Sequence, residues 1–274
     1  MQSGPIGIFD SGYGGLTILT EIKRRLPQYD YLYLGDNARA PYGSRSFDVV
    51  YDFTLQAVKE LFSRGCHLVI LACNTASAKA LRSIQQNDLP HIDPSRRVLG
   101  VIIPTVEALD RLSRSKHVGV VATPGTILSK SYSIETEKLF PHIRVNEVAC
   151  PMWVPLIENN EANGPGADYF VEKYCREVMA KDPLIDTLLL GCTHYPLLYD
   201  KIRRAMPDSV NIIPQGRLVA DSLADYLRRH PEIEQKCSRH SRLEFLTTEN
   251  PSKFDSLATL FLSLPVSSQR IQLT

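Results

Sequence analysis

Two cysteines of this chain each follow a short apolar run and precede small polar residues. The run LVILA comes directly before Cys73, and the run LLLG comes directly before Cys192. Four or five such residues, closed by turn-forming types, predict a buried strand of a parallel sheet. Ligands of these sheets bind beyond the carboxyl ends of the strands. Two thiols on opposite sides of one cleft could work as an acid and a base, one removing a proton from carbon while the other protonates the opposite face.

Other roles for these cysteines must be weighed. Cysteine is among the most buried residue types, so each could simply pack in a core. Met1 to Pro5 carries no basic residue of a signal peptide, so we expect a cytoplasmic, reducing compartment, which disfavours a disulfide. Cys192-x-His194 could supply two metal ligands, but no second pair of suitable spacing accompanies it. The other four cysteines do not share the sequence context of Cys73 and Cys192, and they show no C-x-x-C spacing of the kind that zinc or a redox pair would need. They are Cys66, Cys150, Cys175 and Cys237.

The composition indicates a small-molecule partner. Lys and Arg number 31 against 30 Asp and Glu, and the formal net charge is +1. This balance leaves no electrostatic footprint for nucleic acid or an anionic membrane. No apolar run approaches the length that crosses a bilayer. A chain of 274 residues has room for two domains of ordinary size.

Apolar runs alternate with helix-period segments through most of the chain. This alternation is typical of an α/β fold with a doubly wound parallel sheet and helices on both faces. Helical spacing is clear in Leu16–Leu26, Phe47–Arg64 and Val106–Leu112. The predicted strands are Ile6–Phe9, Tyr31–Leu34, Leu68–Ala72, Val98–Ile102, Val118–Ala122, Val145–Val148, Thr187–Leu190 and Val210–Ile213.

The chain also repeats itself loosely. Ile6–Gly12 is similar to Val118–Pro124, and the two cysteines are separated by nearly the same number of residues as these segments. Two pairs at similar offsets favour an internal duplication over a chance likeness of strand–turn–helix units. A duplication would place Cys73 and Cys192 at equivalent strand ends of two similar sheets that face each other across a cleft.

A glycine-rich turn, residues 12–15, follows the first predicted strand. It could cradle a phosphate, and Asp36 lies near the position at which a dinucleotide fold reads the ribose. The match is partial, because Thr17 stands where the third glycine of the fingerprint belongs. Asp10, directly before the turn, would repel a pyrophosphate. Beside a thiol, a carboxylate could instead accept the thiol proton or set the ionisation of the thiol.

Six short motifs stand in a fixed order between about residue 6 and about residue 230. They are Asp10–Gly15, Asp36–Gly43, Ala72–Ala76, Gly100–Pro104, Ala122–Thr126 and Gly191–Leu197. In type, order and spacing they resemble the glutamate racemases of the aspartate/glutamate racemase family. The resemblance weakens after Arg229, although Leu243–Thr248 is still similar to the late strand of that family.

The resemblance implies two pseudo-symmetric α/β domains, each with a doubly wound parallel sheet, and an active site in the cleft between them. The first domain would comprise residues 1–97 and 208–274 and would carry Asp10 and Cys73. The second, residues 98–207, would carry Cys192 and His194. The implied partner is the small-molecule substrate glutamate, with no nucleic acid and no membrane, and we expect a homodimer.

The resemblance further implies racemisation by two bases without pyridoxal phosphate, metal or any other cofactor. An α-hydrogen is weakly acidic, so a thiol with an ordinary pKa of about 8.5 must act as a thiolate and the carbanion must be sheltered. Cys73 would take the α-proton of D-glutamate and Cys192 that of L-glutamate, in support of peptidoglycan synthesis. Asp10 would be the polar partner of Cys73, and His194 that of Cys192. An N-cap for Asp10 and a supporting hydrogen bond from His194 are the alternatives.

Substrate binding in the family relies on short polar side chains and backbone donors. Backbone N–H groups at helix N-termini can hold carboxylates without a side-chain cation. Asp36, Thr123 and Glu158 could equally be turn or cap residues and are left outside the implied set. The residues that correspond to the family's binding set are Asp10, Ser11, Tyr42, Gly43, Asn74, Thr75, Thr193 and His194.

Three other functions remain open. A relative that acts on aspartate or another amino acid would share the motifs, which do not measure the length of the pocket. A thiol hydrolase would use Cys192 with His194, which leaves Cys73 unexplained. A non-enzymatic role, such as sequestering another protein, would leave the purified protein without turnover on any amino acid.

Overall fold

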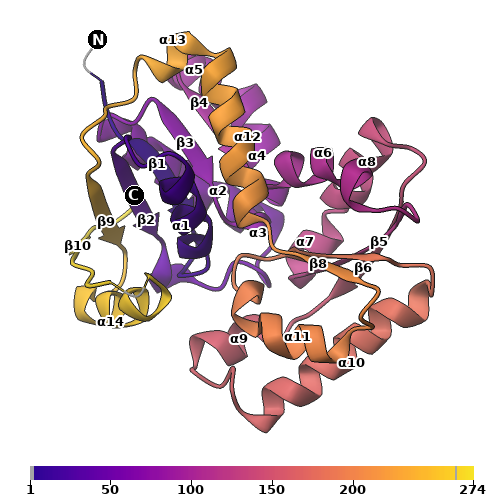
Figure 1. Ribbon diagram of the computed structural model, residues 1–274. Helices are drawn as coiled ribbons and strands as arrows, with labels where there is room; N and C mark the ends of the chain where they lie inside the picture. Colours follow the sequence, from indigo (N-terminus) through magenta and orange to yellow (C-terminus); the bar gives the residue numbers. More distant parts are fainter. Residues whose placement is uncertain (1–2, 263) are drawn as a thin grey trace.

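The computed structural model describes residues 3–262 and 264–274 of the chain. Two parallel β-sheets lie side by side, and helices cover both faces of each (Figure 1). The N-terminal and C-terminal parts of the chain build the first sheet, and the middle part builds the second. The chain therefore crosses between the sheets twice, once after the fourth strand and once after the eighth.

The first sheet has six strands, all paired in parallel. In spatial order they are β10 (Ser268–Arg270), β9 (Leu243–Thr247), β2 (Tyr31–Gly35), β1 (Ile6–Asp10), β3 (Leu68–Leu71) and β4 (Arg97–Gly100). The second sheet has four parallel strands, in the order β6 (Arg144–Ala149), β5 (His117–Ala122), β7 (Thr187–Gly191) and β8 (Asn211–Ile213).

The order 2-1-3-4 in the first sheet recurs as 6-5-7-8 in the second. Under this equivalence β3 corresponds to β7, so the turns that carry Cys73 and Cys192 occupy matching positions. The predicted α/β class with two pseudo-symmetric parallel sheets is thus confirmed, as is the equivalence of the two cysteine-bearing strand ends.

Helices fill the connections between strands. They are α1 (Gly15–Arg25), α2 (Phe47–Ser63), α3 (Asn74–Lys79), α4 (Leu81–Ser83), α5 (Leu89–Ile92), α6 (Ile102–Leu112), α7 (Pro124–Leu128), α8 (Ser131–Leu139), α9 (Trp153–Glu158), α10 (Pro165–Lys181), α11 (Tyr199–Ala205), α12 (Gly216–Arg229), α13 (Pro231–Glu234) and α14 (Pro251–Leu262). Among the described residues, none of the helices is both long and apolar enough to cross a membrane.

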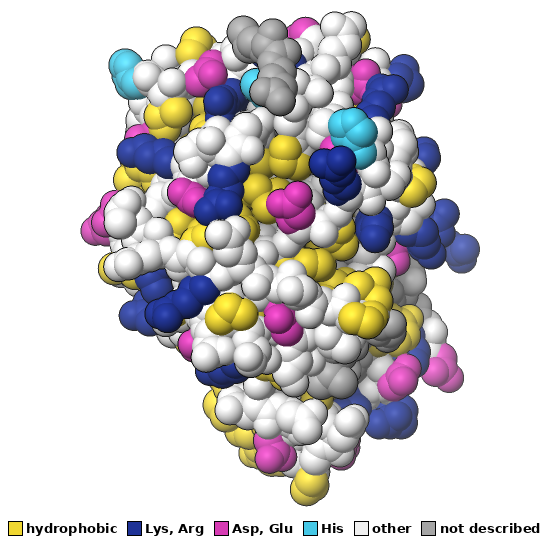
Figure 2. All heavy atoms as spheres, turned by 90° about the vertical axis from the view of Figure 1, so that its left-hand side faces the viewer, with side chains coloured by type: hydrophobic (Ala, Val, Ile, Leu, Met, Phe, Trp, Pro, Cys, Tyr) yellow, Lys and Arg dark blue, Asp and Glu magenta, His cyan; other side chains and the backbone are white. Residues whose placement is uncertain are grey.

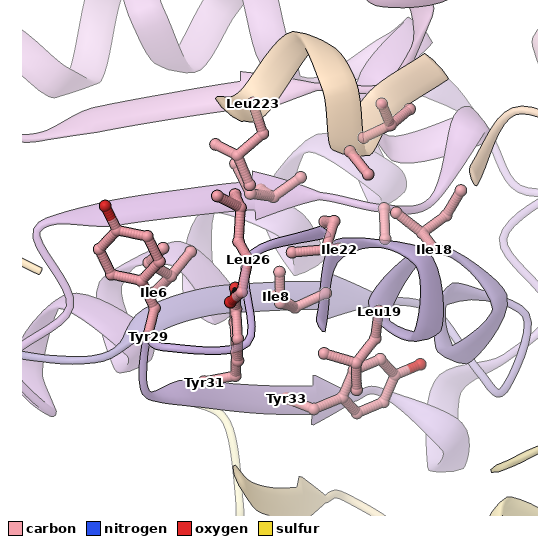
Figure 3. Packing of buried hydrophobic residues seen from close by; sticks show 14 of the residues in the cluster. Ile6, Ile8, Ile18, Leu19, Ile22, Leu26, Tyr29, Tyr31, Tyr33 and Leu223 are labelled. Carbon is pink, nitrogen blue, oxygen red and sulfur yellow. Dashed lines mark hydrogen bonds between the residues drawn. The ribbon is translucent and has the colours of Figure 1, made fainter. Parts of the chain in front are cut away.

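Alternation along β1 divides the core of the first half between the two faces of its sheet. Ile6 and Ile8 point toward α1 and α12, where they pack with Ile22 and Leu223 (Figure 3). Phe9, the residue after Ile8, points to the opposite face and packs against α2. Residues buried on both faces of a sheet are mostly apolar, which is why Ile6–Phe9 of β1 form a short apolar run before Asp10.

The second sheet is covered in the same way. Its inner strands pack against α10 on one face, where Trp153 and Tyr195 meet edge to face with ring centroids 4.6 Å apart. On the other face they pack against α6 and α8, and Tyr132 of α8 is fully buried. These two close-packed cores fix the ends of the strands, and the turns that follow the strands are therefore held in fixed positions as well.

Most predicted strands agree with the structure to within one or two residues. The prediction was wrong at Ile102, because β4 ends at Gly100 and Ile102 begins α6. Pro104 is tolerated there because the first turn of a helix has no intrahelical use for its missing N–H. Strand β10 was not predicted, since its exposed edge position requires no apolar residue.

Sheet membership changes slightly later than the expected domain boundaries. β4 continues the first sheet to Gly100, beyond residue 97, and β8 pairs with β7 although it lies after residue 207. The crossings between the two halves therefore fall directly after Gly100 and Ile213.

Acidic and basic side chains are interspersed over the face shown in Figure 2. This mixed surface agrees with the formal net charge of +1 and presents no field of one sign on that face.

Candidate active site

The carboxyl ends of strands from both sheets meet at one cavity of about 120 Å³. β1 delivers Asp10, the turn after β3 delivers Cys73, and the turn after β7 delivers Cys192. Each of the two thiols is 6% exposed. The cavity is roughly ten times the volume that one water needs, which suits a small molecule.

Cys73 caps the first turn of α3. The Ala76 N–H donates to its Sγ at 3.5 Å, and the Ser11 hydroxyl lies at 3.5 Å from the same sulfur. Burial and, to a smaller extent, the neighbouring Asp10 carboxylate raise the pKa of Cys73 to about 12, against the contacts from Ser11 and Ala76, which lower it. At neutral pH this sulfur therefore rests as the protonated thiol.

Cys192 has a different partner. Nδ1 of His194 lies 3.9 Å from the Cys192 Sγ, and Nε2 of the same ring lies 3.0 Å from Oε1 of Glu158. Burial by itself would lower the His194 pKa, but the hydrogen bonds to Cys192 and Glu158 outweigh it and raise that pKa to about 10. The imidazole is thus protonated at neutral pH and can donate to the sulfur and to the carboxylate at once.

Asp10 lies at the boundary between the halves. Its Oδ2 accepts from the Gly12 N–H at 2.9 Å, and its Oδ1 is buried without a hydrogen-bond partner among the described residues. Burial raises the pKa of this carboxyl group, although the charge of His194 lowers it. A buried carboxylate with an open oxygen and a raised pKa is a suitable proton acceptor.

The glycine-rich turn serves close approach of the two halves. A Cβ on Gly14 would lie 2.4 Å from both His194 Nδ1 and Thr193 Oγ1. The Thr17 hydroxyl, one turn later, donates to the Thr193 carbonyl at 3.0 Å. Glycine is required here so that backbone of the first half can lie against the turn that carries Cys192.

The loop after β2 closes one side of the cavity. Asp36 accepts hydrogen bonds from Tyr42, from Arg39 at 2.7 Å and from Thr248 at 2.8 Å. The Gly43 carbonyl accepts from the Gly125 N–H of the second half at 2.7 Å. Asp36 thus accepts hydrogen bonds from three donors of its own chain and shapes the loop, which disfavours the ribose-reading role considered for it.

Three further polar contacts join the halves in and beside the cavity. The Thr75 and Thr123 hydroxyl oxygens lie 2.9 Å apart, and Thr123 also caps α7. The side-chain oxygen and one amide N–H of Asn74 are bound to Tyr132 and Gln215, which leaves one amide N–H for a ligand.

Every residue proposed from the sequence for catalysis or binding lines this cavity. The set comprises Asp10, Ser11, Tyr42, Gly43, Cys73, Asn74, Thr75, Cys192, Thr193 and His194. Their individual roles stay predictions. The Tyr42 hydroxyl is turned to Asp36, so Tyr42 would meet a ligand through its ring or its backbone.

Sequence reasoning left out several lining residues, among them Glu158, Thr123 and Cys150. The position of Glu158 at the end of α9 offers no local signal for its contact with His194, which depends on the tertiary packing of the second half. The described lining residues include neither lysine nor arginine. A bound carboxylate would therefore depend on backbone and neutral side-chain donors.

Comparisons with known proteins find racemases that are similar to this chain over most of its length. The sequence model of the Asp/Glu/hydantoin racemase family matches residues 16–222. A glutamate racemase of Roseobacter denitrificans is 42% identical over 267 residues, which cover 94% of this chain and 96% of that protein.

Two solved structures are similar over nearly the whole chain. Glutamate racemase isoform RacE1 of Bacillus anthracis superposes with a TM-score of 0.90 at 32% identity, covering 100% of this chain and 99% of that one. A glutamate racemase of Francisella tularensis in complex with D-glutamate gives a TM-score of 0.87 at 32% identity, covering 99% and 98% of the two chains.

The unlike surroundings of the thiols predict an order of alkylation. All six cysteines are free and buried, but only some of them face the cavity. Iodoacetamide at pH 7.5 should modify Cys192 before Cys73, because the protonated imidazole of His194 lies beside the Cys192 sulfur, whereas burial and Asp10 raise the pKa of Cys73. Between pH 7 and 10 the Cys73 rate should rise about tenfold per pH unit, as expected for a pKa of about 12.

Peptide mass spectrometry at timed intervals measures this order. Cys237 is the control, since it packs in the core of the first half and should react only on unfolding. Reaction of Cys73 ahead of Cys192, or a Cys73 rate that does not change with pH, would contradict the assignment of the two environments.

Proposed function

The chain belongs to the Asp/Glu/hydantoin racemase family, and from that premise we propose that it interconverts L- and D-glutamate through proton transfers between the substrate α-carbon and the thiols of Cys73 and Cys192. The observation that carries the proposal is the placement of two buried thiols, each delivered by a different sheet, in the wall of one small cavity. Because the two turns face each other across the junction, each sulfur can address a different face of one carbon.

The resting protonation states favour the reaction from L-glutamate to D-glutamate. With His194 protonated and the Cys73 pKa at about 12, the enzyme rests with Cys73 as the thiol and with the Cys192 sulfur beside a cation. L-Glutamate then loses its α-proton to the Cys192 thiolate. The electron pair stays on the α-carbon, and the Cys73 S–H bond breaks to protonate the opposite face and form D-glutamate.

The reverse direction needs the opposite pair of states. Cys73 must first lose its proton, and Asp10, whose pKa is raised by burial, is the base we assign to accept it. His194 in turn passes a proton to the Cys192 sulfur, which becomes the thiol that protonates the carbanion. Charge is conserved, because one proton leaves Cys73 for Asp10 while another leaves His194 for Cys192.

Glu158 acts through His194 in this scheme. Its carboxylate holds Nε2 at 3.0 Å, which turns Nδ1 toward the sulfur of Cys192. It is therefore a positioning residue, comparable to the carboxylates that orient histidines in other sites. The D-glutamate formed would serve peptidoglycan synthesis.

A thiol hydrolase is the second candidate, because Cys192, His194 and Glu158 form a thiol–imidazole–carboxylate series. A hydrolase would have no use for Cys73, whose sulfur faces the same cavity with its own hydroxyl and carboxylate neighbours. The presence of this second equipped thiol favours the racemase.

Replacement of Cys73 separates the two candidates, because a hydrolase would need only Cys192. Cys73→Ser and Cys192→Ser should each lower racemisation by at least about 10³-fold in both directions, because each sulfur is an acid in one direction and a base in the other. The assay is circular dichroism of enantiopure glutamate with dialysed, chelator-treated enzyme. Cys237→Ser is the matched control and should keep its turnover. Near-normal racemisation by Cys73→Ser would overturn the mechanism.

The unlike partners of the thiols predict a directional effect. Asp10→Asn should chiefly slow proton removal from D-glutamate, and His194→Asn chiefly that from L-glutamate. The end point must stay at equal amounts of both enantiomers, so the bias must be sought in primary deuterium isotope effects with α-deuterated D- and L-glutamate. The impaired direction should show the larger effect, because proton removal becomes more rate-limiting there.

Glu158→Gln provides the matched comparison in this series. It should shift the isotope effects in the same direction as His194→Asn but by less, since the imidazole itself remains. Equal increases in both directions for Asp10→Asn and His194→Asn would mean that neither residue serves one thiol in particular.

A further inference from the structure

Three buried side chains close a ring of hydrogen bonds at the junction of the two halves. The Asn74 amide N–H donates to Gln215 Oε1 at 2.7 Å, the Gln215 amide N–H donates to the Tyr132 hydroxyl at 2.8 Å, and that hydroxyl donates to Asn74 Oδ1 at 2.6 Å. None of the three residues is more than 2% exposed. Each of the three side chains donates one hydrogen bond and accepts one within the ring.

Both catalytic turns are in direct contact with this ring. Asn74 follows Cys73 in the chain and is the first residue of α3. Tyr132, on α8, packs against Gly191, where an added Cβ would lie 3.2 Å from the ring atom Cε2. Gly191 directly precedes Cys192. One end of Tyr132 therefore contacts the neighbour of the first thiol, and its ring contacts the neighbour of the second.

Gln215 joins the ring to both crossings between the sheets. It lies in the second crossing, between β8 and α12. Its amide nitrogen also lies 2.9 Å from Thr105 Oγ1 and 3.4 Å from the carbonyl of Val101, and Val101 is in the first crossing. Rotation of one half against the other must move these two crossings, and such a movement would break buried hydrogen bonds, at a cost for each polar group that is left buried without a partner.

We propose that this ring is a clasp that fixes the separation of the two thiols, and that Gln215 and Tyr132 are positioning residues for racemisation. The inference rests on the proposed function, because the separation matters only if one substrate carbon must be reached from both sides. Proton transfer depends steeply on the distance between the reacting atoms, so a small change of the angle between the halves would slow both directions. A ring that served folding alone would lower stability without this effect.

Tyr132→Phe tests the clasp, since it deletes only the hydroxyl. We expect kcat to fall by about 10- to 100-fold in both directions. The primary deuterium isotope effect should rise for both enantiomers, because a misplaced thiol makes proton transfer more rate-limiting. This symmetric rise differs from the one-sided change expected for Asp10→Asn or His194→Asn.

Tyr31→Phe is the matched control. Its hydroxyl is also buried and donates to the Leu26 carbonyl at 2.6 Å, but Tyr31 lies in the core of the first half and takes no part in the ring. It should lower Tm to a similar degree while kcat stays within about twofold of the wild type. If Tyr132→Phe loses the same Tm and keeps wild-type kcat and isotope effects, the ring is only structural and the proposal is wrong.

Gln215→Met provides a second variant in case Tyr132→Phe does not fold. It removes the side chain that bonds both crossings, and its effect on kcat should be at least as large. In the double variant the two effects should be clearly less than additive, since both act through one ring. Additive effects would contradict a shared clasp. If the wild-type enzyme does not racemise glutamate, both the proposed function and the role of the clasp are wrong. If the wild type racemises glutamate and the ring variants keep its kcat and isotope effects, only the clasp is wrong.

Discussion

Burial of two thiols in one cavity is the constraint on which the rest of the structure depends. A dry cavity shelters a carbanion, but it also opposes the charge that a thiol needs in order to act as a base. At Cys73 this opposition raises the pKa to about 12. Each sulfur must therefore be supplied with polar partners that are themselves buried, and these partners must come from rigid strand ends. The repeated strand order of the two halves provides two such ends.

The two halves are alike in topology and unlike in electrostatics. Cys73 has a hydroxyl and a carboxylate as neighbours, whereas Cys192 has an imidazole that is held by Glu158. A site of this kind can accept both enantiomers of a substrate that differ in configuration at one carbon. The two halves repeat the same fold, while the proton donors and acceptors that they supply differ. Such a site works only if the two halves keep a fixed relative position, which explains the many polar contacts at their junction.

Much of the fold could be predicted because strands buried on both faces appear as short apolar runs. The two thiols were identified in the same way, by their position after such runs. Contacts between the halves could not be predicted, since they depend on residues that are far apart in the sequence. Gly14 illustrates this limit: its role is clear only once His194 is seen against it. Gln215 likewise has no local pattern that would indicate its contacts with Asn74 and Tyr132.

The most direct test of the account is the early labelling of glutamate in deuterated water. If each thiol serves a different face of the substrate, the product enantiomer should acquire solvent deuterium at the α-carbon, because the second thiol has exchanged with solvent before substrate binds. The recovered substrate should gain little label at the same time, because the first thiol retains the proton that it has removed. Mass spectrometry of each separated enantiomer, at conversions below about 10%, measures both quantities. Equal early labelling of substrate and product, from either enantiomer, would contradict the account, since it would mean that one base serves both faces.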